Sequence, residues 1–162
     1  EAQARIDALY WPYHAALQKL GEESARRFGM VLLVDCHSMP STAAPLVAGS
    51  SLQRADVVLG DRYGSTCDPA ITACLEELLL GKGLSVVRNK PYSGGFITQS
   101  YGKPHEGFHA LQIEVNRGLY VDERSIRPSA GYAALKRTLA EVADAFLRVL
   151  PDLLAPPAIA AE

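Results

Sequence analysis

The sequence lacks the features that mark several large classes of protein. It has three cysteines, Cys36, Cys67 and Cys74, which form no C-x-x-C pattern, and an odd count of this kind argues against a disulfide framework. No apolar run approaches the roughly 18 residues that a membrane-spanning helix needs. No basic segment followed by an apolar one opens the chain. Secretion and membrane insertion are therefore unsupported, and we expect a protein of the reducing cytoplasm.

An excess of charge of one sign is also missing. The formal net charge is −2 at pH 7, with both signs mixed along the chain. Nucleic-acid-binding surfaces are typically built from a stripe of lysine and arginine with interleaved aromatic residues, and no such stripe occurs. We therefore expect no nucleic-acid partner.

The composition suits one folded domain with a real core. The chain has 162 residues, of which 48% are hydrophobic and 21% charged, and this balance is typical of a single globular domain. No internal repeat or low-complexity linker divides residues 1–162. The expected order of elements is helix, strand, strand, helix, strand, strand, helix, which predicts a three-layer α/β sandwich with helices on both faces of the sheet.

The stretch Met30–Pro40 is the strongest site candidate. Its first five residues are apolar, which predicts a short strand buried on both faces in the middle of a largely parallel sheet. Four side chains that can coordinate, titrate or hydrogen-bond follow this run: Asp35, Cys36, His37 and Ser38. In open α/β sheets, ligands bind outside the carboxyl ends of strands, so we expect a functional site here.

Three helices are predicted by the spacing of apolar residues. The first covers residues 1–28, with apolar side chains every three or four positions that should pack on a core, and Pro12 should kink it or mark where its regular part begins. The second begins after Asp68, a good N-cap, and ends near Gly81. The third covers 130–150 and is expected to end at Pro151. Its buried stripe is Leu135, Leu139, Val142, Phe146 and Leu150.

A second polar cluster follows the predicted strand Leu84–Val87. It contains Arg88, Asn89, Lys90 and the pair Gly94–Gly95, and exposed backbone N–H groups with cations can hold an anion. Spacing alone favours a turn with solvated charges instead. We expect a further short strand at residues 96–98.

The segment Phe108–Arg117 alternates cleanly between two faces. Gln112, Glu114 and Asn116 share one of them, but a surface strand would show the same pattern, so the pattern alone does not give Glu114 a role. A metal-bound water beside His37 would need a carboxylate to take its proton. This requirement favours Glu114 as a general base.

Three blocks of sequence together resemble the N-formylglutamate amidohydrolase family, matching its C-terminal two-thirds. They are Leu33–Pro40, Asn89–Thr98, and His109–Glu114 followed by Leu119–Glu123. Two shorter segments, Tyr10–His14 and Gly60–Cys67, are also similar to that family. The similarity covers the chain from about Tyr10 to Leu150.

The resemblance implies a fold, a reaction and a set of roles. The fold would be a mostly parallel, mixed sheet of the zinc-exopeptidase-like (phosphorylase/hydrolase-like) kind. The reaction would be the hydrolysis of N-formyl-L-glutamate to formate and L-glutamate, in histidine degradation. His37 would bind zinc, and Glu114 would be the general base. The residues expected around the substrate are Asn89, Lys90, Tyr92, Gly94, Gly95 and Gln112.

The sequence leaves the substrate's recognition open. Arg88, Lys90 or Arg117 would hold its carboxylates, and Arg117 could equally pair with Asp122 or Glu123. The substrate could be another N-acyl amino acid. A third alternative is a catalytically incomplete fragment that only binds a ligand or partner.

One departure from the family concerns the metal. Full-length members carry an N-terminal segment with a further histidine, an acidic metal ligand and a Ser-Arg…Asp-x-Asn-Arg block, and none of these occurs here. Catalytic zinc needs about three protein ligands, and this chain supplies only His37 of the expected set. We therefore expect a domain without its N-terminal segment, a shortened form or a degenerate member. Such a chain should have an unpaired sheet edge and an uncovered apolar patch, which favour a homo-oligomer.

Overall fold

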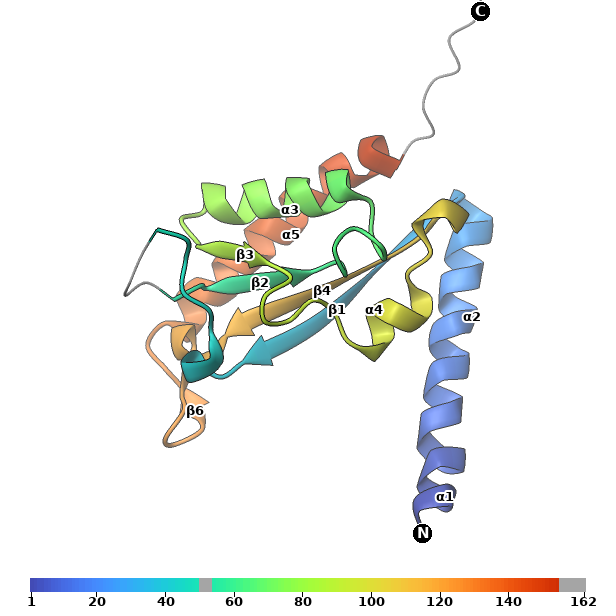
Figure 1. Ribbon diagram of the computed structural model, residues 1–162, viewed down its shortest axis with the longest axis horizontal. Helices are drawn as coiled ribbons and strands as arrows, with labels where there is room; N and C mark the ends of the chain where they lie inside the picture. The colour runs from blue at the N-terminus through green and yellow to red at the C-terminus, as the bar shows by residue number, and fades with distance from the viewer. Residues whose placement is uncertain (50–53, 155–162) are drawn as a thin grey trace, which may run out of the picture.

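A four-stranded mixed sheet forms the centre of the computed structural model, which describes residues 1–49 and 54–154 (Figure 1). Its strand order is β1-β4-β2-β3. The strands are β1 (Val31–Met39), β2 (Val57–Gly60), β3 (Val86–Arg88) and β4 (Phe108–Asn116). β1 is parallel to β4 and β2 to β3, while β2 and β4 are antiparallel. The predicted mostly parallel, mixed sheet is confirmed.

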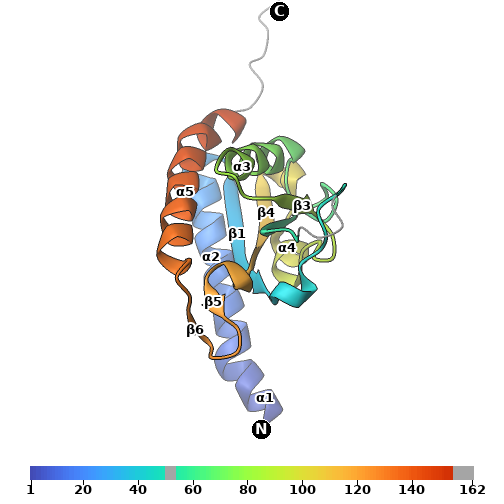
Figure 2. The same ribbon diagram turned by 90° about the vertical axis from the view of Figure 1, so that its left-hand side faces the viewer.

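Helices cover both faces of this sheet. α3 (Pro69–Gly81) and α5 (Tyr132–Leu154) pack on the face that carries Leu59 and Leu111, where they enclose the main core. α4 (Phe96–Tyr101) lies on the other face, away from α3 and α5 (Figures 1 and 2). The predicted α/β architecture with flanking helices is therefore confirmed.

The N-terminal helix forms as predicted but does not pack as predicted. It consists of α1 (Ala2–Arg5), a π-helical segment η1 (Ile6–Tyr10) and α2 (Trp11–Phe28), so Pro12 marks where the regular part begins. The expected packing of its apolar side on a core is wrong, because its first half projects beyond the sheet (Figure 1). Exposure is 57–68% for Leu9, Trp11, Tyr13, Leu20 and Phe28.

The predicted central position of the first strand is also wrong. β1 is an edge strand among the described residues, and Val34 is 36% exposed. The strand continues through the polar residues to Met39, because β4 pairs with it residue by residue. The polar cluster therefore lies on the strand and not beyond its end. The strand that is buried on both faces is β4, which excludes the surface-strand alternative for Glu114.

Two predictions of local structure are corrected. Residues 96–98 form the start of α4 rather than a strand, and the hydroxyl of Thr98 donates a hydrogen bond to the carbonyl of Gly95 at the helix start. Pro151 does not end α5, which continues to Leu154. A proline removes one backbone N–H donor from a helix, but the residues after Pro151 keep the helical conformation as far as Leu154.

The remaining elements are short. β5 (Val121–Asp122) and β6 (Arg127–Pro128) form a small hairpin. Single 3₁₀ turns occur at η2 (Ser41–Ala43), η3 (Pro104–Glu106) and η4 (Arg117–Leu119). Within the described part of the chain, no helix combines the length and apolar character needed to cross a membrane.

The core confirms the predicted stripe of α5 and the predicted cap of α3. Val142 and Phe146 are buried against α3, and Leu139 and Leu150 pack beside them. The carboxylate of Asp68 accepts a hydrogen bond from the amide of Ala70, at 2.8 Å. All three cysteines are free thiols, and Cys67 is fully buried.

Candidate active site

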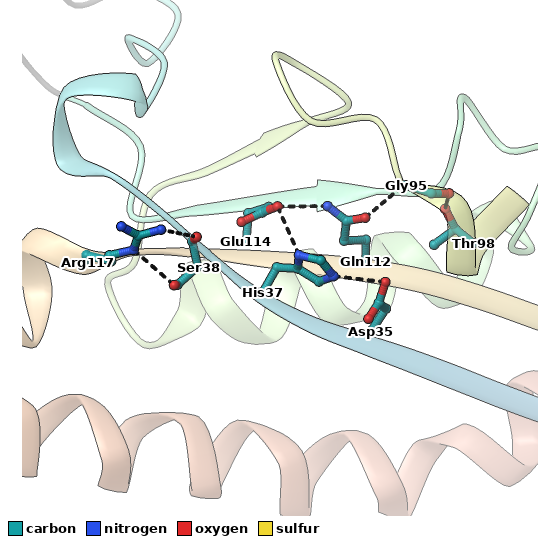
Figure 3. A network of polar contacts seen from close by, with 8 residues as sticks. All are labelled: Asp35, His37, Ser38, Gly95, Thr98, Gln112, Glu114 and Arg117. Carbon is teal, nitrogen blue, oxygen red and sulfur yellow. Dashed lines mark hydrogen bonds and ion pairs between the residues drawn. The ribbon is translucent and has the colours of Figure 1, made fainter. Parts of the chain in front are cut away.

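The alternation of two neighbouring strands places four polar side chains on one face of the sheet (Figure 3). β1 contributes Asp35 and His37, and β4 contributes Gln112 and Glu114. His37 and Glu114 are directly paired in the strand register. We call this set the polar face. Cys36 and Ser38, the other members of the predicted cluster, alternate to the opposite face.

His37 lies between two carboxylates. Its Nε2 is 3.1 Å from Asp35 Oδ2, and its Nδ1 is 3.7 Å from Glu114 Oε1. The His37 side chain is 47% exposed, whereas that of Glu114 is 7% exposed. The imidazole thus covers a buried carboxylate and can itself be reached from solvent. The sequence analysis gave Asp35 no role, although its i, i+2 spacing from His37 on a strand could have indicated the contact.

Gln112 fixes the position of Glu114. Its amide nitrogen donates to Glu114 Oε1 at 2.8 Å, and its amide oxygen accepts a hydrogen bond from the backbone N–H of Gly95 at 2.7 Å. Both ends of the amide therefore have partners inside the protein. Gln112 orients the carboxylate and connects it to the loop before α4.

Burial raises the pKa of the Glu114 carboxyl above its ordinary value. The charge of His37, the hydrogen bond from Gln112 and the charge of Arg117 act in the opposite direction, and Asp35 adds to the rise. A carboxylate with a raised pKa is a better proton acceptor near neutral pH than a solvated one. The environment of Glu114 therefore suits a general base.

Arg117 follows β4 on the side of Glu114 that is away from Gly95 (Figure 3). Its guanidinium donates to the hydroxyl and the carbonyl of Ser38, at 3.1 and 3.2 Å. Arg117 forms no ion pair with Asp122 or Glu123 among the described residues. The carboxylate of Glu123 instead accepts hydrogen bonds from Ser41, so the predicted alternative pairing of Arg117 is not observed.

Two other predicted residues have partners within the protein. The guanidinium of Arg88 donates from Nε to Glu76 of α3, at 2.8 Å, and forms an ion pair there. Asn89 is buried and joins two loops, since its amide nitrogen donates to Asp61 Oδ1 at 2.8 Å and its oxygen accepts from the N–H of Asp61 at 3.1 Å. Both side chains therefore already have hydrogen-bond partners inside the protein.

The remaining predicted residues lie on or beside the loop that reaches Gln112. Tyr92 packs against a small apolar cluster of Met39, Ala44 and Val58. Lys90 is exposed, and Gly94 precedes Gly95 in the loop. The structure thus brings His37, Glu114, Gln112 and Gly95 together, while Arg117 is held by Ser38.

The described residues do not fit a zinc site by themselves. They contain no group of three or more histidine, cysteine, aspartate or glutamate side chains placed to share a metal ion. A catalytic zinc has about three protein ligands. His37 is one imidazole, and its ring nitrogens face Asp35 and Glu114.

A groove of about 600 Å³ lies elsewhere, between α2 and the beginnings of β1 and β4. Its lining includes Leu17, Leu33, Tyr101 and Phe108, and none of the predicted site residues. The residues of the polar face therefore do not line this groove.

Comparison with known proteins gives a consistent result. The family model of N-formylglutamate amidohydrolase matches residues 1–121. The N-formylglutamate deformylase of Pseudomonas aeruginosa is 37% identical over 159 residues, which are 95% of this chain. The chain belongs to the N-formylglutamate amidohydrolase family. A second family member, the N-formylglutamate deformylase of Pseudomonas putida, is 32% identical over 124 residues, or 76% of this chain.

Solved structures agree with this family and with the fold. The N-formylglutamate amidohydrolase of Ralstonia eutropha JMP134 superposes with a TM-score of 0.81 at 38% identity, over 94% of this chain and 54% of that one. A gene product of Agrobacterium tumefaciens, at 23% identity and a TM-score of 0.62, shares the fold over 91% of this chain and 54% of its own.

The chain spans about half the length of the curated relatives that it matches. It covers 55% of the Pseudomonas aeruginosa protein and 45% of the Pseudomonas putida protein. This share is smaller than the two-thirds expected from the sequence blocks.

Proposed function

We propose that this chain carries the proton-transferring part of an amidohydrolase that cleaves N-formyl-L-glutamate to formate and L-glutamate. The observation that carries the proposal is the buried carboxylate of Glu114, held by Gln112 at 2.8 Å and facing His37. The names of the relatives support the substrate. We place the reaction in cytoplasmic histidine degradation.

The side chains support a simple sequence of proton transfers. Glu114 takes a proton from a water molecule, whose oxygen forms a bond to the formyl carbon. Glu114 then returns the proton to the amide nitrogen, the C–N bond breaks, and formate and L-glutamate separate. Gln112 keeps the carboxylate oriented throughout, and the positive charge of Arg117 opposes the rise in the pKa of Glu114.

Dependence on a metal is a further part of the proposal. His37 would be one ligand of a zinc ion, and the other ligands would come from outside the described residues. Metal analysis of the purified protein, before and after dialysis against a chelator, measures this directly. Stoichiometric zinc that is lost in His37→Ala would support the assignment.

Formate release from N-formyl-L-glutamate tests the proposed reaction. Glu114→Gln should lower kcat by about 10²–10⁴-fold, the usual contribution of general base catalysis. His105→Ala is a matched control, because the His105 side chain is 78% exposed and lies outside the polar face. Full activity of Glu114→Gln would show that the role assigned to Glu114 is wrong.

A second candidate is a chain that binds the N-acyl amino acid without turning it over. The lack of a metal-binding group among the described residues favours it. Calorimetry with N-formyl-L-glutamate separates the two functions. Binding without formate release, in the presence of added zinc, would identify this second function.

A further inference from the structure

N-Formyl-L-glutamate has two carboxylates, so its recognition calls for two groups of positive charge, and Arg117 is one candidate. Arg117 lies beyond Glu114 on the side away from Gly95 and is held by Ser38 (Figure 3), so we expect it to meet the carboxylate nearer the bond that breaks. That is the α-carboxylate, which is two bonds from the amide nitrogen. The side-chain carboxylate of the same substrate would extend along the polar face, away from Arg117.

The opposite end of the polar face is formed by the loop that contains Gly94 and Gly95. Gln112 separates Glu114 from Gly95, and Arg117 lies at the far side of Glu114 (Figure 3). A cation that binds the second carboxylate should therefore lie on this loop or be held by it. Arg88 does not meet this condition, since it is paired with Glu76 on the α3 side of the sheet.

Arg62 meets the condition. Its Nη1 donates to the carbonyl of Gly94 at 3.2 Å, and its backbone N–H donates to the carbonyl of Ser93 at 2.7 Å. These are the residues that directly precede Gly95. Contacts therefore run without a break from the guanidinium of Arg62 through Gly94, Gly95 and Gln112 to Glu114.

The position of Arg62 is fixed by an unusual backbone. Arg62 and Tyr63 both have positive φ angles, of 49° and 59°, a conformation that costs free energy in residues other than glycine and is concentrated at functional sites. The buried Asp61 is held by Asn89, at 2.8 Å. At Gly60, the last residue of β2, a Cβ atom would lie 2.7 Å from the backbone of Gly94, so only glycine lets the strand end and the loop approach this closely.

The guanidinium has capacity left for a ligand. A guanidinium has five N–H donors. Among the described residues, one hydrogen bond from the Arg62 guanidinium is formed, to the backbone carbonyl of Gly94. Arg62 is half-buried, which strengthens its interaction with an anion relative to a fully solvated arginine. A carboxylate fits two parallel N–H donors of a guanidinium.

We propose that Arg62 binds the side-chain carboxylate of the substrate and so selects acidic N-acyl amino acids. This assignment rests on the proposed function, because it takes Glu114 as the place where the amide bond is cleaved. It adds a specificity-determining residue that lies outside the set predicted from the sequence. Arg117 and Arg62 then hold the two carboxylates at opposite ends of one substrate.

The test compares N-formyl-L-glutamate with N-formyl-L-glutamine, which has the same shape and lacks the side-chain charge. The full protein should prefer the glutamate compound in kcat/KM. Arg62→Gln should lower kcat/KM for that compound about 10- to 100-fold, mainly through KM, and change that for the glutamine compound less than about threefold. Arg62→Lys should restore part of the preference. Arg148→Gln, an exposed arginine on α5, is the control.

Two readouts keep this proposal distinct from the proposed function. If the wild-type protein releases no formate from either compound, the proposed reaction fails, and calorimetric binding of the same two compounds tests Arg62. Tighter wild-type binding of the glutamate compound that is lost in Arg62→Gln would support the assignment. Equal binding of the two compounds, no binding, or an unchanged preference in folded Arg62→Gln would overturn it.

Discussion

Glu114 owes its chemical character to its surroundings on the polar face. Burial raises its pKa, and Gln112 holds one of its oxygens. The sequence identifies a carboxylate on an alternating strand, but its burial follows from the central place of β4 in the sheet. The proposed role of Glu114 as a general base therefore depends on one side chain that the sequence identifies and on several neighbours that only the fold supplies.

The pH dependence of formate release should reflect this burial. Glu114 acts only when it has lost its proton, so kcat/KM should rise with pH through a midpoint above 4.5, the ordinary value for glutamate. A pH–rate profile between pH 4 and 8 measures the midpoint. A midpoint at or below the ordinary value would contradict the role given to burial.

The free energy of unfolding should also depend on the protonation of Glu114. Activity needs the deprotonated carboxylate, whereas stability is greater when the carboxyl is protonated. Because the folded protein holds the proton of Glu114 more tightly than the unfolded chain, the contribution of Glu114 to the free energy of unfolding is present below pH 4.5 and is lost as the pH rises through its raised pKa. Glu114→Gln should therefore gain in Tm relative to the wild type between pH 4 and pH 8. A constant difference across this range would argue against a raised pKa. Thermal denaturation at both pH values measures the effect.

Asn89 shows a different use of a buried polar side chain. Its amide satisfies the buried carboxylate and N–H of Asp61. Asn89→Ala would leave these groups unpaired and should cost about 1–3 kcal/mol in the free energy of unfolding. Gln99→Ala removes an exposed amide and should have little effect. Urea denaturation of both variants gives the comparison, and equal losses would show that burial is not the cause.

At the scale of elements, α3 is the clearest case of a helix defined by local sequence. Asp68 caps it, Pro69 begins it, and its apolar side is buried against α5. β1 is the opposite case, since its apolar start predicted a central strand and its place at the edge follows from pairing with β4 alone. Capping depends on adjacent residues, whereas strand order depends on distant ones.

The cap of α3 gives a prediction at this scale. Asp68→Ala removes the acceptor of the Ala70 amide and should cost about 1 kcal/mol in the free energy of unfolding. Asp68→Asn keeps a side-chain oxygen at the cap and should lose much less. The two variants can be compared by thermal denaturation. The same loss in both would assign the effect to the charge and not to the cap.

The whole molecule exposes an unusual amount of apolar surface on its N-terminal helix. Leu9, Trp11, Tyr13, Leu20 and Phe28 are all more than half exposed, and β1 has one unpaired edge among the described residues. Exposed apolar patches and open strand edges favour association. We therefore propose a homo-oligomer, as expected from the sequence, and we propose that its copies associate through this apolar surface.

Self-association should be sensitive to this surface in particular. Leu20→Gln on α2 should shift the protein towards the monomer in sedimentation velocity. Leu147→Gln on α5 is the matched control, because the two leucines have similar exposures of 61% and 63%. Equal effects of the two substitutions would assign association to general hydrophobicity rather than to the N-terminal helix.

The sequence by itself determined the local elements and the chemical groups of this protein. The cap at Asp68 and the alternation of 108–116 follow from neighbouring residues, and the family, with His37 and Glu114 as its expected site residues, follows from short blocks of sequence. Only the tertiary structure decided that β1 lies at the edge, that Arg88 points to α3, and that Arg62 joins the loop beside Gln112. Strand order and register are set by contacts between residues far apart in the chain, and hydrophobic patterns within one segment do not record those contacts.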